Sequence, residues 1–264
     1  MNAISRMNER AGALLRPIDR GTWIVLALWT LVFISVPIFR WTWGEPGLTA
    51  GITLGVIAQV GAVSYVLARA WGVRRALVTA LIVIICGWGV EFIGHTTGFP
   101  FGGYDYTERF QPQLGGVPLL IPLAWMMMMP PAWALGYLLA GRWGGLPFVA
   151  ASAVAITAWD FFLDPQMVTW NAWVFDMPGE MAYVGLIPWT NFLGWLLTAA
   201  IITLVARPRQ LPLTPMLIIY SITWALHLIG QLFFWELPVS AIVGGVVMGI
   251  VMIGGWLRLR ERAP

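Results

Sequence analysis

The sequence has few charged residues: 10% of its 264 residues are Asp, Glu, Lys or Arg, whereas 59% are hydrophobic. A soluble domain could not cover so much apolar surface with so few charges, so the composition excludes an ordinary water-soluble protein. Lysine is absent, and all 15 basic residues are arginines. The composition indicates an integral membrane protein.

Cysteine and histidine are also scarce. The single cysteine, Cys86, excludes an intrachain disulfide and a cysteine-based zinc or iron–sulfur site. Two histidines are few for metal chemistry, so we expect no metal and no other cofactor. A nucleic-acid partner is not expected either, because the basic residues flank apolar runs and form no soluble, aromatic-interleaved surface.

Long apolar runs dominate the rest of the chain. Each is close to the roughly 20 residues that cross a hydrocarbon core of about 30 Å. The runs are continuous and lack the period-two alternation of an outer-membrane barrel. The predicted fold class is therefore all-α, a polytopic transmembrane bundle of about eight helices. The predicted helices lie near residues 21–39, 48–68, 76–95, 118–140, 147–164, 188–206, 213–235 and 238–257.

The arginines predict the topology of this bundle. With eight helices, thirteen of the fifteen arginines fall on one side, and only Arg40 and Arg109 fall on the other. The positive-inside rule therefore predicts that both termini are cytoplasmic, in a multi-pass protein of the cell membrane. Residues 1–20 are expected to be a cytoplasmic tail, residues 21–257 one bundle domain, and residues 258–264 a second tail. The predicted outer loops are 96–117 and 165–187.

Polar residues gather at the outer ends of several predicted helices. Glu91 with His95, and Asp160 with Asp164, are i, i+4 pairs, and each pair shares one helix face. Asn191 begins another helix, and His227 adds a polar group in the outer half of the next. Ionisable groups inside a membrane are costly and usually functional, so these residues, apart from His95, are the candidate catalytic residues.

Structural interpretations compete with these assignments. Asp164 precedes Pro165, a pair that commonly begins a turn or ends a helix. His95 is equally compatible with an interfacial position, and His227 with a hydrogen-bonded core histidine.

The two outer loops are long and rich in aromatic residues, glycine and proline, which favours folded lids over an apolar ligand; an aromatic belt at the interface is the alternative. Their similar lengths also predict a weak internal duplication. The candidate substrate-binding residues are Trp88, His95, Phe101, Tyr104, Trp125, Trp159 and Trp189. The loops contribute further aromatic or apolar side chains at Tyr106, Trp170, Trp173, Phe175, Met177 and Tyr183.

These parts together favour proton-initiated chemistry on a lipid. A carboxylic acid desolvated among aromatic rings can act as a general acid, and aromatic faces stabilise a carbocation. Hydration of an isoprenoid double bond and its isomerisation or cyclisation both fit, and the residues alone do not choose between them.

Four segments carry a resemblance to a known family: GWGVEFIGHTTGFPFGGYDY (87–106), GVPLLIPLAW (116–125), WDFFLDP (159–165) and GLIPWTNFLGW (185–195). The pattern E-x-x-G-x-x-x-G-x-P-F-G-x-Y-x-Y, from Glu91 to Tyr106, is the most specific. The sequence resembles the carotenoid-biosynthesis membrane family that includes the CruF-type carotenoid hydratases. That resemblance implies addition of water to the terminal double bond of an acyclic carotenoid ψ-end, giving a tertiary alcohol. The implied partners are a lipophilic carotenoid, the lipid bilayer and other carotenoid-biosynthesis enzymes.

The working hypothesis gives the proton to the alkene from Glu91 or Asp160. The other carboxylate, with His227 or Asn191, then holds and deprotonates the attacking water. One alternative is a membrane prenyltransferase that uses the D-x-x-x-D pair Asp160 and Asp164 with Mg²⁺ and an allylic diphosphate. Another is a carotenoid-binding or transport protein without catalysis.

Overall fold

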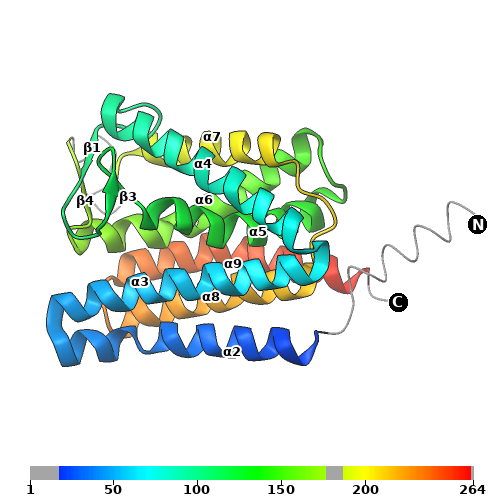
Figure 1. Ribbon diagram of the computed structural model, residues 1–264, viewed down its shortest axis with the longest axis horizontal. Helices are drawn as coiled ribbons and strands as arrows, with labels where there is room; N and C mark the ends of the chain where they lie inside the picture. Colours follow the sequence, from blue (N-terminus) through cyan, green and yellow to red (C-terminus); the bar gives the residue numbers. More distant parts are fainter. Residues whose placement is uncertain (1–17, 177–186, 263–264) are drawn as a thin grey trace, which may run out of the picture.

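The computed structural model describes residues 18–176 and 187–262, and within them the fold is an all-helical bundle (Figure 1). Seven helices are long and apolar enough to cross a membrane; α2 is shorter. The helices are α2 (Arg20–Ile34), α3 (Val36–Trp71), α4 (Val73–Thr97), α5 (Leu120–Ala140), α6 (Gly145–Thr169), α7 (Trp189–Ala206), α8 (Leu213–Phe233) and α9 (Pro238–Arg260). The prediction of a polytopic bundle of about eight helices is confirmed.

The first two predicted spans meet inside α3. Gly44 has φ 64° and ψ −143°, outside helical geometry, and the chain reverses direction around it (Figure 1). Glycine tolerates this positive φ because it has no Cβ. α2 and the first residues of α3 therefore form the first span, and the rest of α3 forms the second. At the start of α2, the Asp19 side chain accepts hydrogen bonds from the backbone N–H and hydroxyl of Thr22, which hold the pKa of Asp19 below its usual value.

α5 is the most enclosed helix of the bundle and contacts α3, α4, α6, α8 and α9. Every residue from Trp125 to Gly136 is buried. The run contains no charged residue, as expected for a helix surrounded by other helices. Gly136 lets α5 approach α6 closely, because a Cβ there would collide with the Ser152 hydroxyl and lie 3.1 Å from the carbonyl oxygen of Phe148.

The two long loops that the sequence predicts on the outer side pair with each other over one end of the bundle. β1 (Tyr104–Tyr106) and β4 (Trp173–Phe175) form an antiparallel sheet in which Tyr104 lies opposite Phe175, and Tyr106 opposite Trp173. A second short pair, β2 (Gln113–Leu114) with β3 (Val117–Pro118), leads into α5. The Arg109 guanidinium fastens the first loop, because it donates to the Trp170 carbonyl at 2.6 Å and pairs with Glu45 at 2.5 Å.

The prediction that Asp164 and Pro165 form a turn or a helix end is wrong. α6 continues through Pro165 to Thr169, and Asp164 is buried inside it. A proline inside a helix leaves the carbonyl four residues earlier without its backbone donor. Here that carbonyl belongs to Phe161, and the Ser240 hydroxyl of α9 donates to it at 3.1 Å, sharing its one hydrogen with Gln231 Oε1 at 2.6 Å. A donor from a distant helix therefore allows α6 to continue, which the local sequence does not reveal.

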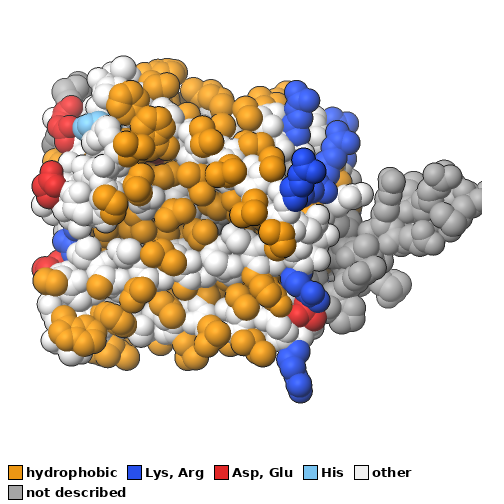
Figure 2. All heavy atoms as spheres, in the orientation of Figure 1, with side chains coloured by type: hydrophobic (Ala, Val, Ile, Leu, Met, Phe, Trp, Pro, Cys, Tyr) orange, Lys and Arg blue, Asp and Glu red, His pale blue; other side chains and the backbone are white. Residues whose placement is uncertain are grey.

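Charges are segregated along the bundle. On the face shown in Figure 2, most arginines gather at the end where α4 begins, whereas acidic residues and a histidine lie mainly at the opposite end, beside the paired loops. This separation agrees with the arginine pattern from which the cytoplasmic termini were predicted, and the orientation itself remains a prediction.

Replacing Gly136 with Ala should destabilise the bundle by about 1–3 kcal/mol, the usual cost of overpacking a close-packed core. The added methyl group meets α6 backbone atoms, including the Ser152 nitrogen at 3.0 Å, which cannot move aside cheaply. Thermal unfolding in detergent measures the effect. Gly61→Ala is the matched control, because a Cβ at Gly61 has no neighbour within 4 Å among the described residues. Equal unfolding temperatures for the two variants would contradict the close contact between α5 and α6.

Candidate active site

A cavity lies under the paired loops, at the end of the bundle opposite the main group of arginines. Its empty space is about 650 Å³, including the part that opens outward. Its walls come from α3 to α7 and from the loops that carry β1 and β4. The lining residues are Ile52, Val56, Glu91, Phe101, Tyr104, Tyr106, Phe110, Leu120, Ile121, Ala124, Trp125, Met127, Leu163, Asp164, Met167, Trp173, Phe175, Asn191 and Trp195.

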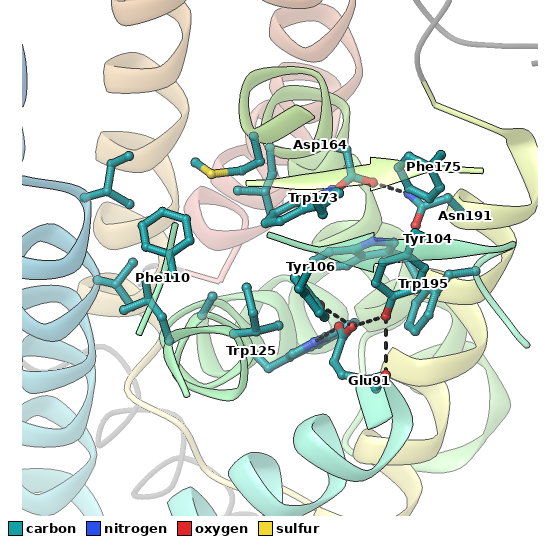
Figure 3. Close-up of a pocket in the computed structure, with 18 of the residues that line it drawn as sticks. Glu91, Tyr104, Tyr106, Phe110, Trp125, Asp164, Trp173, Phe175, Asn191 and Trp195 are labelled. Atoms are coloured by element: carbon teal, nitrogen blue, oxygen red, sulfur yellow. Dashed lines mark hydrogen bonds between the residues drawn. The ribbon is translucent and has the colours of Figure 1, made fainter. Parts of the chain in front are cut away.

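Glu91 is the most heavily hydrogen-bonded group in this cavity (Figure 3). The hydroxyls of Tyr104 and Tyr106 both donate to its Oε2 at 2.7 Å, and the Trp125 ring N–H donates to its Oε1 at 2.8 Å. The donors come from β1 and α5, whereas Glu91 belongs to α4. Both carboxylate oxygens are thus satisfied by neutral groups, an arrangement that stabilises an ionised carboxylate without a countercharge.

Glycines of α4 make room for these donors. Gly87 and Gly94 lie one turn on either side of Glu91 and share its helix face. A Cβ at Gly87 would lie 3.2 Å from the Trp125 ring, and one at Gly94 would lie 3.0 Å from the Tyr104 hydroxyl. The pattern G-x-x-x-E-x-x-G therefore places the carboxylate on a helix face where the neighbouring glycines have no side chains, so aromatic rings can pack closely beside it.

The two tyrosines remain hydrogen-bond donors over the whole working pH range. Burial raises the pKa of both Tyr104 and Tyr106 above the ordinary tyrosine value, and the neighbouring Glu91 carboxylate raises it further. A phenolate beside a buried carboxylate would place two negative charges together. Both hydroxyls therefore keep their protons and their hydrogen bonds to Glu91.

A second acidic group, formed by Asp160, Asp164 and Asn191, belongs to the same site. The Asn191 amide donates to Asp160 Oδ2 at 2.9 Å and to Asp164 Oδ2. All three residues are buried, and Asp160 Oδ1 has no hydrogen-bond partner among the described residues. In Figure 3, Asp164 and Asn191 lie on the side of the cavity opposite Glu91. One amide is a poor match for two full negative charges, so the pair is better satisfied when it carries a proton.

Aromatic rings form the walls between the two acidic groups. Trp125 stacks on Trp195 with ring centroids 4.3 Å apart, and Tyr106 meets Trp173 edge-on at 5.9 Å. Away from the carboxylates the lining becomes aliphatic and sulfur-containing, with Ile52, Val56, Met127 and Met167 among its residues. The cavity is therefore polar only around its carboxylates and apolar elsewhere.

The structure brings six of the predicted site residues onto this cavity: Glu91, Asp164, Asn191, Phe101, Tyr104 and Trp125. Asp160 is not among the lining residues, but it shares the Asn191 amide with Asp164. The remaining predicted residues are not among those that line the cavity.

One of these residues is His227. Its Nε2 accepts a hydrogen bond from the Trp159 ring N–H at 3.4 Å, and its Nδ1 lies 2.9 Å from the Thr223 carbonyl oxygen. These contacts match the alternative of a hydrogen-bonded core histidine.

The other aromatic candidates also lie off the cavity. Trp159 does not line the cavity but packs edge-on against Trp195, which does. Trp88 donates to the Leu114 carbonyl at 3.1 Å, which ties α4 to β2. His95 lies beside Asp105, with Nδ1 3.6 Å from the carboxylate, and Trp189 is 43% exposed.

Several lining residues were not singled out as site residues from the sequence. Tyr106, Trp173 and Phe175 stood only among the loop aromatics, and their pairing across β1 and β4 is what places them here. Trp195 lies four residues after Asn191, and this i, i+4 spacing could have revealed it. Met127 and Met167 carry no such signal. Met177 and Tyr183, also named as loop residues, lie outside the described residues.

Among the described residues, no group of three or more His, Cys, Asp or Glu could hold a metal ion.

The fold and the cavity together define the class of protein. It is a helical membrane protein whose ligand pocket is apolar except around its carboxylate groups. Residues 51–252 match the family model described as carotenoid biosynthesis protein, and the chain belongs to that family. The matched region includes every residue that lines the cavity.

A bisanhydrobacterioruberin hydratase of Haloarcula japonica is 30% identical to this chain over 135 residues. The alignment covers 50% of this chain and 45% of that hydratase, so the chain matches about half the length of this relative. No solved structure matches the chain.

Replacing Trp125 with Phe should destabilise the protein by about 1–3 kcal/mol, because Glu91 Oε1 is then buried without its donor. Trp29→Phe is the control: Trp29 is also buried, but its ring N–H has no hydrogen-bond partner among the described residues. Thermal unfolding of both variants in one detergent measures the difference. A loss in Trp29→Phe as large as in Trp125→Phe would show that side-chain volume, not the hydrogen bond, decides stability.

Proposed function

We propose that the protein is a cofactor-independent hydratase that adds water across the terminal double bond of an acyclic carotenoid ψ-end. The product is a tertiary alcohol. Membership in the carotenoid biosynthesis family supports the substrate class, and the relative named as a hydratase supports the reaction class. The observation that carries the proposal is the opposition of two unlike carboxylate groups, Glu91 and the Asp160–Asp164 pair, across an aromatic cavity.

The hydrogen bonds support different roles for the two groups. Glu91 accepts three hydrogen bonds from neutral donors, which favour its ionised form, so we give it the role of the base. Asp160 and Asp164 share one amide, so this pair holds the proton. Asp164 is the member that lines the cavity, and it is therefore the general acid. This assignment replaces the working hypothesis, in which Asp160 or Glu91 was the acid.

Hydration then proceeds in two balanced steps. Asp164 gives its proton to the less substituted carbon of the terminal alkene, and the cation forms on the carbon that carries the two methyl groups. Water attacks that carbon and forms the C–O bond, while Glu91 accepts a proton from the water. Return of this proton to the aspartate pair restores the site, so the reaction consumes only water and alkene. General acid and base groups each typically contribute about a hundred- to ten-thousandfold.

The aromatic walls protect the cation between these steps. The faces of Trp125, Trp195 and Trp173 offer the electron-rich surfaces that attract a cation. The lining is largely apolar, so only water molecules held by the carboxylates would reach the cation. Isomerisation or cyclisation would begin with the same protonation and would also end by loss of a proton to a base, so the two carboxylate groups fit all three reactions. The relative named as a hydratase favours hydration among them.

The shape of the cavity agrees with an end-on substrate. The polar groups suit the reacting end of the molecule, and the aliphatic lining suits the hydrocarbon that follows it. The rest of a long polyene would extend beyond the cavity toward the bilayer. The partners in this proposal are accordingly the carotenoid, the membrane lipids and the enzymes that make and modify the same pigment.

Expression in a host that makes an acyclic carotene such as lycopene should yield pigments heavier by one water per modified end. Mass spectrometry after growth in isotopically labelled water should show the label in the new hydroxyl group. An unchanged carotene mass would favour isomerisation, pigment binding or transport. A requirement for Mg²⁺ and an allylic diphosphate would contradict the proposal in favour of a prenyltransferase.

Asp164→Asn and Glu91→Gln should each lower product formation about a hundredfold or more, because each removes one proton-transfer group. Asp160→Asn should have a smaller effect, since Asp160 acts through Asn191 and does not line the cavity. Product yield per folded protein is the measurement, with Asp105→Asn as a control because that carboxylate is 75% exposed. Wild-type conversion by folded Asp164→Asn would refute the assignment of the acid.

A further inference from the structure

A second hollow lies at the arginine-rich end of the bundle, far along α4 from Glu91. It is a groove between the first turns of α4 and the last residues of α7, two helices that diverge toward this end (Figure 1). Its empty space is about 1050 Å³, including the part open to the surroundings. The lining residues are Trp71, Gly72, Val73, Arg74, Arg75, Val78, Thr79, Ile82, Ala206, Arg207 and Pro208.

The charge in this groove is entirely positive. Arg74, Arg75 and Arg207 line it, and no acidic residue in the described part of the chain does. None of the three forms an ion pair within the part of the chain that the structure describes. Three unneutralised guanidinium groups around one hollow form a site for an anion, and phosphate is the group that arginine recognises best through paired N–H donors.

The groove is also held in shape. Arg75 lies over the Trp71 ring at 4.3 Å and donates to the Arg209 carbonyl at 2.9 Å. The Trp71 ring N–H donates to the Gln210 carbonyl at 2.9 Å. These contacts fix the segment after α7 to the turn between α3 and α4, so Arg207 is kept close to the arginines of α4 without a ligand.

One wall of the groove is apolar and continues along the outer surface of the bundle. Val78 and Ile82 line it one and two turns above the arginines, and Ile85, 64% exposed, follows on α4. A free anion would use only the arginines. A molecule with an anionic head and a hydrocarbon tail would use both parts.

Other arginines at the same end are arranged differently. Arg258 pairs with Glu261 at 2.9 Å, and the Arg262 guanidinium lies over the Tyr137 ring at 4.7 Å. Neither lines the groove. The groove is thus distinct from the general positive charge of this end, which attracts anionic membranes without a defined site.

We propose that this groove binds one anionic phospholipid, with its phosphate among Arg74, Arg75 and Arg207 and an acyl chain along Val78 and Ile82. The bound lipid neutralises the arginines and fills the gap between α4 and α7. Because α4 also carries Glu91, the lipid supports the helix that holds the base of the proposed reaction.

Native mass spectrometry of the purified full-length protein, titrated with phosphatidylglycerol or phosphatidylcholine, tests this site. Phosphatidylglycerol should bind the wild type with one saturable site, and phosphatidylcholine should not. The double variant Arg74→Gln with Arg207→Gln should weaken that binding by roughly fivefold for each arginine, the usual contribution of a basic residue near an anionic membrane surface. Arg258→Gln with Arg260→Gln removes the same charge from the same end and should leave the site unchanged.

Three outcomes would overturn the proposal. Equal weakening in the two double variants would mean diffuse attraction, and equal binding of phosphatidylcholine would mean that the net negative charge of the lipid is not recognised. Displacement of the lipid by inorganic phosphate at similar concentrations would assign the groove to a free anion. If the groove variant does not fold, Val78→Trp tests the apolar wall with all arginines intact, and unchanged lipid binding there would also refute the site.

Discussion

The burial of a carboxylate among membrane helices is the constraint on which this structure depends. Glu91 is 5% exposed, and its carboxyl group has no cationic partner among the described residues. An ionised group at such a position is tolerated only when other groups replace the hydration it loses. Three elements meet to do this: α4 provides the carboxylate on a glycine-flanked face, α5 provides the Trp125 donor, and β1 provides two tyrosine hydroxyls.

This requirement also explains why the long loops are folded. The tyrosines reach Glu91 only because β1 is held in place by its pairing with β4, and Arg109 fastens the same loop to Glu45 and to the end of α6. The loops therefore close the cavity and complete its hydrogen bonds at the same time. A change that loosens β1 would remove two of the three donors at Glu91, so the stability of the loops and the geometry of the candidate site are coupled.

The sequence was sufficient to predict the helical bundle and six of the residues that line the cavity, but not the direction in which the other candidate side chains face. Hydrophobic run length predicts spans because the thickness of the bilayer sets it. Which way a side chain faces depends on helix rotation, and one residue turns the direction by about 100°. Asp160 and Asp164 are both buried, yet only Asp164 lines the cavity. His227 faces Trp159 and the preceding turn of its helix, and Pro165 lies inside α6 because Ser240 supplies a donor from another helix. Such relations arise between distant segments and leave no local pattern.

The neutral character of the Glu91 donors has a consequence for selectivity. Among the described residues, no arginine or lysine lines the cavity, so the polar end that they form is negative or uncharged. A ligand that brought a phosphate or a carboxylate group to this end would meet no positive charge there and would be disfavoured. The lining therefore favours ligands with an uncharged end over ligands with an anionic one.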